Sequence, residues 1–213
     1  MTFCPHCEGA DAIFDQKTAA SDLRDYQKGG AGGTTKRLLD AIKAAGVSGL
    51  SLLDIGGGIG VIQHELAAAG VERVTDVDAS RAYLRMAREE AERRGYAENA
   101  SYVHGDFVAL SPQIDDADIV TMDRVICCYP HVEALVESAA SKARRIFGVV
   151  YPRDLWWIKL GMPVMNFFLR LQGTAFRGFV HPSATVERIT ASHGFRKVAQ
   201  HDGWLWQVSV FAK

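Results

Sequence analysis

The stretch Leu53 to Gly60, LDIGGGIG, places a carboxylate and a run of glycines directly after a short apolar segment. Glycines in such a loop let the backbone approach a ligand closely and turn sharply into a helix. A dinucleotide site needs the spacing G-x-G-x-x-G, but Val61 stands where the third glycine is required. The spacing that fits is Asp54 followed by Gly56, Gly58 and Gly60. A carboxylate at this strand end suits a ligand that carries a cationic group.

Two further acidic residues follow predicted strands. Asp78 ends the second strand, 20 residues after Gly58, and Asp106 follows the third strand. In an open α/β sheet ligands bind at the carboxyl ends of the strands, so these acids point to the same site as the glycine loop.

Alternating strands and helices are expected to position these residues. Helix signals and apolar periodicity predict helices over residues 34–45, 59–69, 80–94, 131–144 and 182–194. Strands are predicted over 50–55, 73–77, 101–104, 117–126, 145–151, 195–199 and 204–212. This alternation predicts a largely parallel α/β sheet. Only a short polar turn, residues 200–203, separates the last two strands, so this pair must be antiparallel.

The ordered motifs resemble those of class I S-adenosylmethionine-dependent methyltransferases, over about residues 34–150 and, through the antiparallel tail, to the C-terminus. The resemblance implies an α/β, Rossmann-like, seven-stranded, mostly parallel sheet with an antiparallel last strand, helices on both faces and an apolar lid insert. It also implies that Asp78 takes the ribose hydroxyls, Asp106 takes the adenine amino group, and Phe107 flanks the adenine. The expected S-adenosylmethionine-binding residues are Tyr26, Asp54, Gly56, Gly58, Gly60, Asp78, Ala79, Asp106, Phe107 and Asp123.

A second, looser resemblance concerns the ends of the chain. The lead-in DLRDYQKGGAGG and the tail segments GVVYPRDLWWIKLG and FRGFVHP are similar to those of magnesium-protoporphyrin O-methyltransferases. The N-terminal sequence CPHC is not a feature of that group. The acceptor molecule is therefore left open, as is the acceptor atom, which can be O, N, S or C.

Candidate catalytic residues lie after the fourth strand, where the methyl group and the acceptor would meet. His131 can act as a general base, since imidazole titrates near neutrality, or it can simply open the following helix. Arg124 can bind an anionic substrate through two hydrogen bonds, or pair with the neighbouring Asp123. Tyr129 completes the candidate set. A base is needed only if the acceptor carries a proton at the working pH.

Length and composition indicate which partners, domains and location to expect. The chain has 213 residues, 48% of them hydrophobic, with 24 basic and 25 acidic residues, so no basic footprint for nucleic acid is present. We expect a lead-in over residues 1–33, a methyltransferase domain over 34–213, and within it a substrate lid over 152–182. The N-terminus does not look like a signal peptide, and charged and helix-breaking residues interrupt the most apolar window, 155–171. We therefore expect no transmembrane segment and a cytoplasmic location.

The lead-in and the insert are interpreted as covers of the site. Residues 1–33 are polar and turn-rich, which predicts a flexible segment that can fold over a site. The resemblance implies that Tyr26 closes over the cofactor from this segment; the alternative is that Tyr26 is simply a packed aromatic residue. The insert carries large aromatic residues, so it can wall a pocket for a flat or apolar substrate, or pack as a pair of helices on the sheet or in a homodimer.

The cysteines supply two of the four ligands that a zinc site needs. Cys4 and Cys7 have zinc-ligand spacing, but the chain has no second C-x-x-C. A mixed site with Cys127 or Cys128 stays an alternative, while burial of that adjacent pair at a strand end is the preferred interpretation. No metal is expected.

The sequence thus predicts methyl transfer from S-adenosylmethionine to a small molecule. One alternative is a non-catalytic binding or regulatory module on the same fold. A less favoured alternative is an NAD-dependent oxidoreductase, which the missing glycine at Val61 argues against. Whether the protein forms a homodimer is left open.

Overall fold

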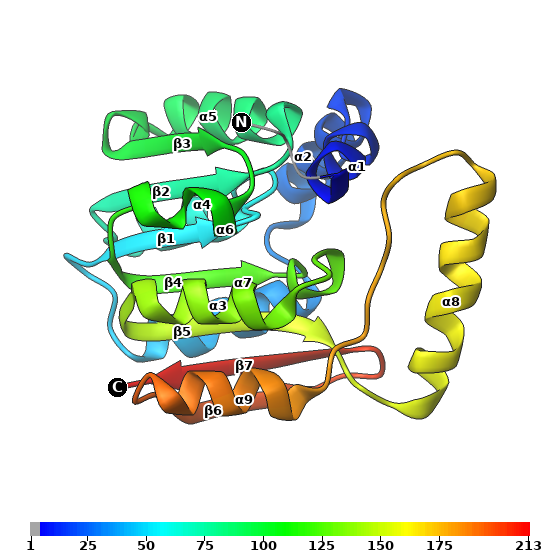
Figure 1. The fold of residues 1–213 in the computed structure, drawn as a ribbon. Coiled ribbons are helices and arrows are strands. Elements are labelled where there is room, and N and C mark those ends of the chain that lie inside the picture. The colour runs from blue at the N-terminus through cyan, green and yellow to red at the C-terminus, as the bar shows by residue number, and fades with distance from the viewer. Residues whose placement is uncertain (1–4) are drawn as a thin grey trace.

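A computed structural model describes residues 5–213, in which seven strands form one sheet (Figure 1). The strand order is β3-β2-β1-β4-β5-β7-β6. Neighbouring strands from β3 to β5 are parallel, whereas β7 runs antiparallel to both β5 and β6. The strands are β1 Ser51–Ile55, β2 Arg73–Asp78, β3 Ala100–His104, β4 Ala117–Asp123, β5 Ala143–Pro152, β6 Arg196–Asp202 and β7 Trp206–Ala212. The predicted Rossmann-like α/β fold is confirmed.

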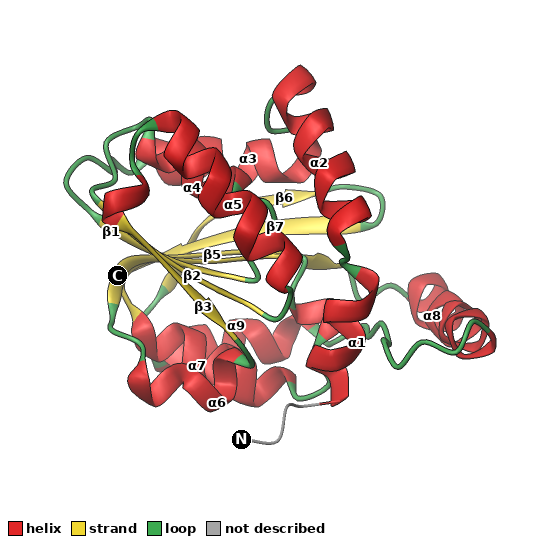
Figure 2. Ribbon diagram, turned by 90° about the horizontal axis from the view of Figure 1, so that it is seen from above, coloured by secondary structure: helices red, strands yellow, loops and turns green. Residues whose placement is uncertain are grey.

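Helices cover both faces of the sheet. Figure 2 shows α3, α4 and α5 on one face, α6, α7 and α9 on the other, and α8 standing apart from the body. The helices are α1 Pro5–Ile13, α2 Gln16–Gly29, α3 Gly33–Ala44, α4 Val61–Ala67, α5 Arg81–Arg94, α6 Phe107–Leu110, α7 Val132–Lys142, α8 Trp156–Leu171 and α9 Ser183–Ser192. Three short 3-10 helices are η1 Ala97–Asn99, η2 Ser111–Gln113 and η3 Ile126–Cys128.

Two apolar layers hold the central strands in place. All five residues of β1 are buried, which is typical of a strand covered by helices on both faces. One layer joins the sheet to α7 and α9, with Leu135 and Phe147 at its centre. The other joins it to α3 and α4, around Leu38 and Leu66. The chain leaves β1 toward β2 on one side, while β4 pairs with β1 on the other. The carboxyl ends of β1 and β4 therefore flank the point where strand order reverses, where α/β folds bind ligands.

The lead-in differs from the flexible, turn-rich segment that the sequence predicts. It forms α1 and α2, and Asp15 caps α2 by accepting a hydrogen bond from Thr18 N at 2.9 Å. Ala19 and Tyr26 of α2 are buried in a small cluster with Ile59 and Tyr83. Packing of this one helical face stabilises a segment whose composition is otherwise polar, because most helical stability in proteins comes from such contacts.

The insert also differs from the helix pair, which was one of the alternatives for this segment. It contains one helix, α8, that continues through Pro163 and is followed by an irregular return segment up to residue 182. The last strand begins at Trp206, two residues later than predicted, because Trp204 and Leu205 lie in the turn after β6. Within residues 5–213, no helix is both long and apolar enough to cross a bilayer.

Candidate active site

A cavity of about 910 Å³ opens at the carboxyl ends of β1, β2 and β4. The glycine loop and the strand-end acids form its floor, and α1 and α2 contribute one wall. Residues of α8 and of the return segment, among them Met162, Met165 and Phe176, contribute another wall. The cavity therefore joins three parts of the chain that are far apart in sequence.

The glycine loop is shaped to approach a ligand. Gly56, Gly58 and Gly60 all have positive φ, of 64°, 59° and 82°. A Cβ on Gly56 would lie 2.5 Å from Val125 Cγ2, so no larger residue fits there without displacement. A Cβ on Gly58 would meet nothing within 4 Å. This open space, together with the positive φ, leaves Gly58 free to face a bound group from the cavity side.

Asp78 is tied to the glycine loop by its own side chain. It is buried, and its two carboxylate oxygens accept hydrogen bonds from Gly58 N at 3.0 Å and Ser80 N at 2.7 Å. Burial raises the pKa of this carboxyl, and the two backbone donors act against that rise. Each oxygen keeps a second lone pair, so Asp78 can still accept two hydroxyl hydrogen bonds from a ribose. Ala79, the next residue, also lines the cavity.

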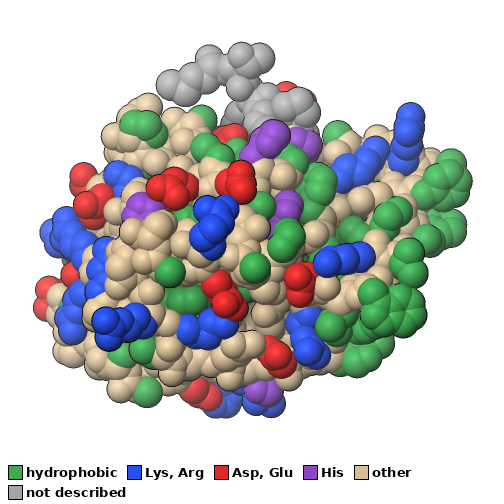
Figure 3. Space-filling model, turned by 60° about the horizontal axis from the view of Figure 1, so that its bottom comes forward, with side chains coloured by type: hydrophobic (Ala, Val, Ile, Leu, Met, Phe, Trp, Pro, Cys, Tyr) green, Lys and Arg blue, Asp and Glu red, His purple; other side chains and the backbone are tan. Residues whose placement is uncertain are grey.

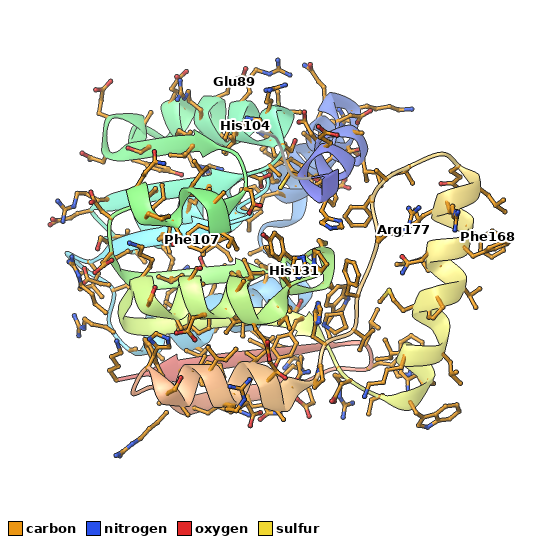
Figure 4. The ribbon with its side chains drawn as sticks, viewed as in Figure 1. Glu89, His104, Phe107, His131, Phe168 and Arg177 are labelled. Carbon is orange, nitrogen blue, oxygen red and sulfur yellow. The ribbon has the colours of Figure 1, made fainter. Side chains whose placement is uncertain are left out.

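Asp106 caps α6 and faces a tyrosine. Its Oδ1 accepts a hydrogen bond from Val108 N at 3.0 Å, and both of its oxygens lie 3.1 Å from the hydroxyl of Tyr129. Phe107 beside it is buried and lines the cavity (Figure 4). The structure thus brings together two expected cofactor residues and one expected catalytic residue.

A third buried acid beneath the loop, Asp76, was not singled out by the sequence reasoning. Asp54 accepts hydrogen bonds from Thr121 Oγ1 at 2.7 Å and Gln63 Nε2 at 3.3 Å. Asp76 is fully buried on the neighbouring strand, and neither of its oxygens makes a hydrogen bond of ordinary geometry, although Gln63 and the Gly57 amide act to lower its pKa. The usable sequence signal was the alternation TDVD, which places Asp76 and Asp78 on one side of β2.

These neighbouring acids disfavour each other's charge. Burial raises the pKa of Asp54 to about 7, and the charges of Asp123 and Asp78 act in the same direction. Burial, followed by the charges of Asp78 and Asp54, raises the pKa of Asp76 well above its usual range. A cationic group bound at this end of the cavity would relieve that repulsion. The acids therefore fit a ligand with an ammonium and a sulfonium, and would disfavour an additional phosphate.

Asp123 and Arg124 form the next corner of the cavity. Asp123 accepts a hydrogen bond from Thr35 Oγ1 at 2.5 Å, and its second oxygen lies 3.7 Å from Arg124 Nε. Arg124 has a φ of 62°, the sole positive φ at a non-glycine residue in the described part of the chain. Its guanidinium donates to Thr34 Oγ1 at 3.1 Å and lies 5.5 Å from the ring centre of Trp206. Strained backbone of this kind concentrates at functional sites.

Tyr26 lies in the cavity wall contributed by α2. Its hydroxyl donates to Glu65 Oε1 at 3.1 Å, its ring stacks on His64, and the Arg94 guanidinium lies 5.0 Å from the ring centre. Burial raises the pKa of Tyr26 to about 12, so the phenol stays protonated. Tyr26 therefore contributes a fixed aromatic surface, and the lead-in lines the site as a helix.

His131 is placed differently from the other candidates. It is exposed at the start of α7 (Figure 4), its ring centre is 6.4 Å from that of Tyr129, and it does not line the cavity. Its side chain makes no capping hydrogen bond to α7. Tyr129, which lines the cavity, therefore stands between His131 and the site, and the role of His131 as a base stays a prediction.

The cysteines lie beside the site. Cys7, Cys127 and Cys128 line the cavity, and the sulfurs of the adjacent pair are 3.6 Å apart. The contact with Cys127 and then burial raise the pKa of the Cys128 thiol well above its usual range. No group of three or more potential ligands is close enough to hold a metal among residues 5–213. Cys4, the other half of the C-x-x-C pair, lies outside the described residues.

Comparison with known proteins gives this geometry a family. Residues 52–146, which run from β1 into β5, match the family model for a methyltransferase domain. The match covers 95 of the 213 residues of the chain. The family uses S-adenosylmethionine as its methyl donor, so the expectations for enzyme class and cofactor are confirmed at this level. Among curated proteins nothing matches.

Solved structures extend the likeness in fold beyond this domain. Magnesium protoporphyrin IX methyltransferase from Synechocystis PCC 6803, with bound SAH, is 19% identical, with a TM-score of 0.65 over 95% of this chain and 84% of that one. A putative sarcosine dimethylglycine methyltransferase from Galdieria sulphuraria is 12% identical, with a TM-score of 0.66 over 84% of each chain. The [4+2]-cyclase SpnF is 15% identical, with a TM-score of 0.64 over 84% of this chain and 80% of that one. At these identities the likeness concerns the fold alone.

Proposed function

We propose that this chain transfers a methyl group from S-adenosylmethionine to a small, substantially apolar acceptor. One observation supports the proposal above the others. Three strand-end carboxylates, Asp54, Asp78 and Asp106, line one cavity together with the open face of Gly58. This donor and acceptor set matches a ligand with an ammonium group, a ribose diol and an adenine amino group, which are the polar groups of S-adenosylmethionine.

Each of these residues would bind a different part of the cofactor. Asp54 would face the cationic amino-acid end, and Asp78 and Ala79 would hold the ribose beside the glycine loop. Asp106 would accept from the adenine amino group, with Phe107 along the ring. Tyr26 and Asp123 would line the remaining sides. Each of these residues lines the cavity.

The acceptor side of the cavity is largely apolar. Its walls include Leu135, Met162, Met165, Phe176 and Trp206, which come from α7, from the insert and from the start of β7. Arg124 adds a cation at the rim. An acceptor with a flat or aliphatic body and one anionic group suits this arrangement, since apolar walls bind its body and Arg124 orients its charge.

The cofactor would supply a methyl group that its sulfonium already activates for displacement. The protein's part is to hold the acceptor atom close to the methyl group, in line with the bond that breaks, and to exclude water. Phe14 and Phe176 line the cavity, and their rings are in edge-to-face contact with centres 5.8 Å apart, so they add apolar wall that would keep water from the reacting atoms. Arg124 and Tyr129 would position the acceptor, and His131 is proposed to accept its proton where one must leave.

Two measurements test the proposal. Denaturing the purified protein and analysing the supernatant by mass spectrometry should release S-adenosylmethionine or S-adenosylhomocysteine, or calorimetry should show binding of either. Release of NAD(H) instead would contradict it. Transfer of a labelled methyl group to apolar acceptors must then be measured separately, because a cyclase on the same fold shows that the architecture alone does not fix the reaction.

A further inference from the structure

Helix α8 turns an apolar stripe away from the protein. Trp156, Leu160, Val164, Phe167, Phe168 and Leu171 are between 56% and 73% exposed. Their spacing of three and four residues places them on one face of the helix. Figure 3 shows these hydrophobic side chains gathered along the protruding edge of the molecule, and Figure 4 shows Phe168 pointing away from the body. A helix on a soluble surface normally has the opposite arrangement.

The other face of α8 turns toward the cavity and the return segment. Ile158 is buried, Met162 is half-buried, and Met165, although 42% exposed, lines the cavity together with Met162. The amide of Asn166 donates to Gly178 O and accepts from Gly178 N, both at 2.8 Å, which fixes the helix to the return segment. The apolar stripe therefore lies on the side of α8 that faces away from the cavity.

The charged residues of α8 and of the return segment are basic. From Leu155 to Val186 the chain contains Lys159, Arg170 and Arg177 but no aspartate or glutamate, and Asp154, just before α8, lies 3.9 Å from Lys159 Nζ. Lys159 and Arg170 are exposed and lie on one flank of the stripe, since they are 11 residues, or about three turns, apart. Near the first turn of α8, Trp204 is 79% exposed and its ring stacks on Trp157 at 4.6 Å. Amphipathic tryptophans of this kind favour the boundary between water and lipid headgroups.

We propose that the outer face of α8, together with Trp204, docks on the surface of an anionic lipid bilayer. The apolar stripe would enter the boundary between headgroups and acyl chains, and Lys159 and Arg170 would meet the phosphates. This inference concerns a surface outside the active site and does not depend on the proposed reaction.

A second copy of the chain fits the same face less well. Two-fold packing about the middle of α8 would set Lys159 of one copy beside Arg170 of the other, because these residues are equally distant from the centre at 164–165. Asp154 is the one acid in residues 152–182 and lies 3.9 Å from Lys159 Nζ, so it does not reach Arg170, which is 16 residues further along the chain. An anionic surface supplies that compensation along the whole helix.

Vesicle flotation tests the proposal. The whole protein should bind vesicles of phosphatidylcholine with about 30% phosphatidylglycerol at about 0.1 M salt, and bind pure phosphatidylcholine at least about tenfold more weakly. Leu160→Ser/Phe167→Ser/Phe168→Ser should lower the partition coefficient by about tenfold or more. Val198→Ser, at an exposed apolar residue on β6, should leave it unchanged. Circular dichroism and melting temperature check that each variant folds.

A charge-reversal pair separates the electrostatic part. Lys159→Glu/Arg170→Glu should remove the preference for anionic vesicles, whereas Arg144→Glu/Arg145→Glu, at the far end of β5, should keep it. Absence of binding to anionic vesicles would overturn the proposal, as would binding that the serine variant leaves unchanged. A dimer in sedimentation that the serine variant dissociates, without vesicle binding, would instead assign the face to a second copy.

Discussion

The hydroxyl of Tyr129 lies 3.1 Å from each carboxylate oxygen of Asp106, so the residue after η3 and the residue that caps α6 act as one unit. Tyr129→Phe removes the donor that holds this carboxylate toward the cavity. We expect the affinity for S-adenosylhomocysteine in calorimetry to weaken by about 3–10-fold, the value of one hydrogen bond.

Tyr102→Phe is the matched control for that experiment. The Tyr102 hydroxyl donates to Ala87 O at 3.3 Å, away from the cavity lining. It should leave the affinity unchanged, and equal losses in the two variants would mean that Tyr129 acts through general stability alone.

Asp78 is expected to be the strongest single contributor to cofactor binding. Asp78→Ala removes a buried carboxylate that joins β2 to Gly58 and faces the cavity, so binding should weaken by about tenfold or more. Asp78→Asn keeps the size of the side chain and separates folding from binding. Asp118→Ala, which loses the hydrogen bonds from Ser51 N and Oγ near the start of β4, should destabilise the protein without changing affinity. Unchanged affinity in both Asp78 variants would refute the ribose assignment.

Asp76 should make the protein less stable as pH rises. Its carboxyl has a raised pKa in the folded state, so between the unfolded value of 3.8 and the higher folded value the native protein holds a proton that the unfolded chain has lost. Stability falls with pH across that window. Asp76→Asn removes this titration, and its melting temperature relative to the parent should be higher at pH 8 than at pH 5 by about 2–4 °C or more.

Asp118→Asn provides the control of opposite sign. Although burial raises the pKa of Asp118, the hydrogen bonds from Ser51 lower it overall, so its stabilising contribution is already complete above pH 3.8. This variant should lose the same stability at pH 5 and pH 8. A pH-independent effect of Asp76→Asn would show that its carboxyl does not stay protonated in the folded protein.

Arg124 carries a backbone conformation that favours glycine. Arg124→Gly and Arg124→Ala remove the same contacts with Thr34 and Trp206, but only alanine retains the Cβ at a φ of 62°. Arg124→Gly should therefore be more stable than Arg124→Ala by about 1 kcal/mol in urea unfolding. The same pair of substitutions at Lys36, inside α3, should give the opposite order.

His131 is tested by turnover. If it accepts the proton of the acceptor, His131→Ala should lower kcat by about 10²-fold or more at saturating concentrations of both substrates. His193→Ala removes a histidine that bonds Glu137 at 2.8 Å, outside the cavity lining, and should keep the parent's kcat. A change below about threefold in His131→Ala would remove the residue from catalysis.

The central sheet was predictable because its signals are local. A short apolar run, an acid and alternating glycines identify β1 and its loop, and Ser80 and Gly95 mark the ends of α5. The lead-in helices were not predictable in the same way, since Ala19 and Tyr26 are ordered by packing against Ile59 and Tyr83, which are distant in sequence. Asp76 was missed for a related reason. The burial of its carboxyl group can be recognised only when β2 is placed between β1 and β3.

Both ends of the insert are bonded to the sheet side of the molecule. Arg153 N donates to Leu205 O at 2.9 Å, and Phe179 N donates to Cys127 O at 2.7 Å. Residues between these two bonds contribute no strand to the sheet and none of the carboxylates expected to bind the cofactor. Substitutions between these two bonds would therefore alter one wall of the cavity and leave in place the strands and the carboxylates at its floor.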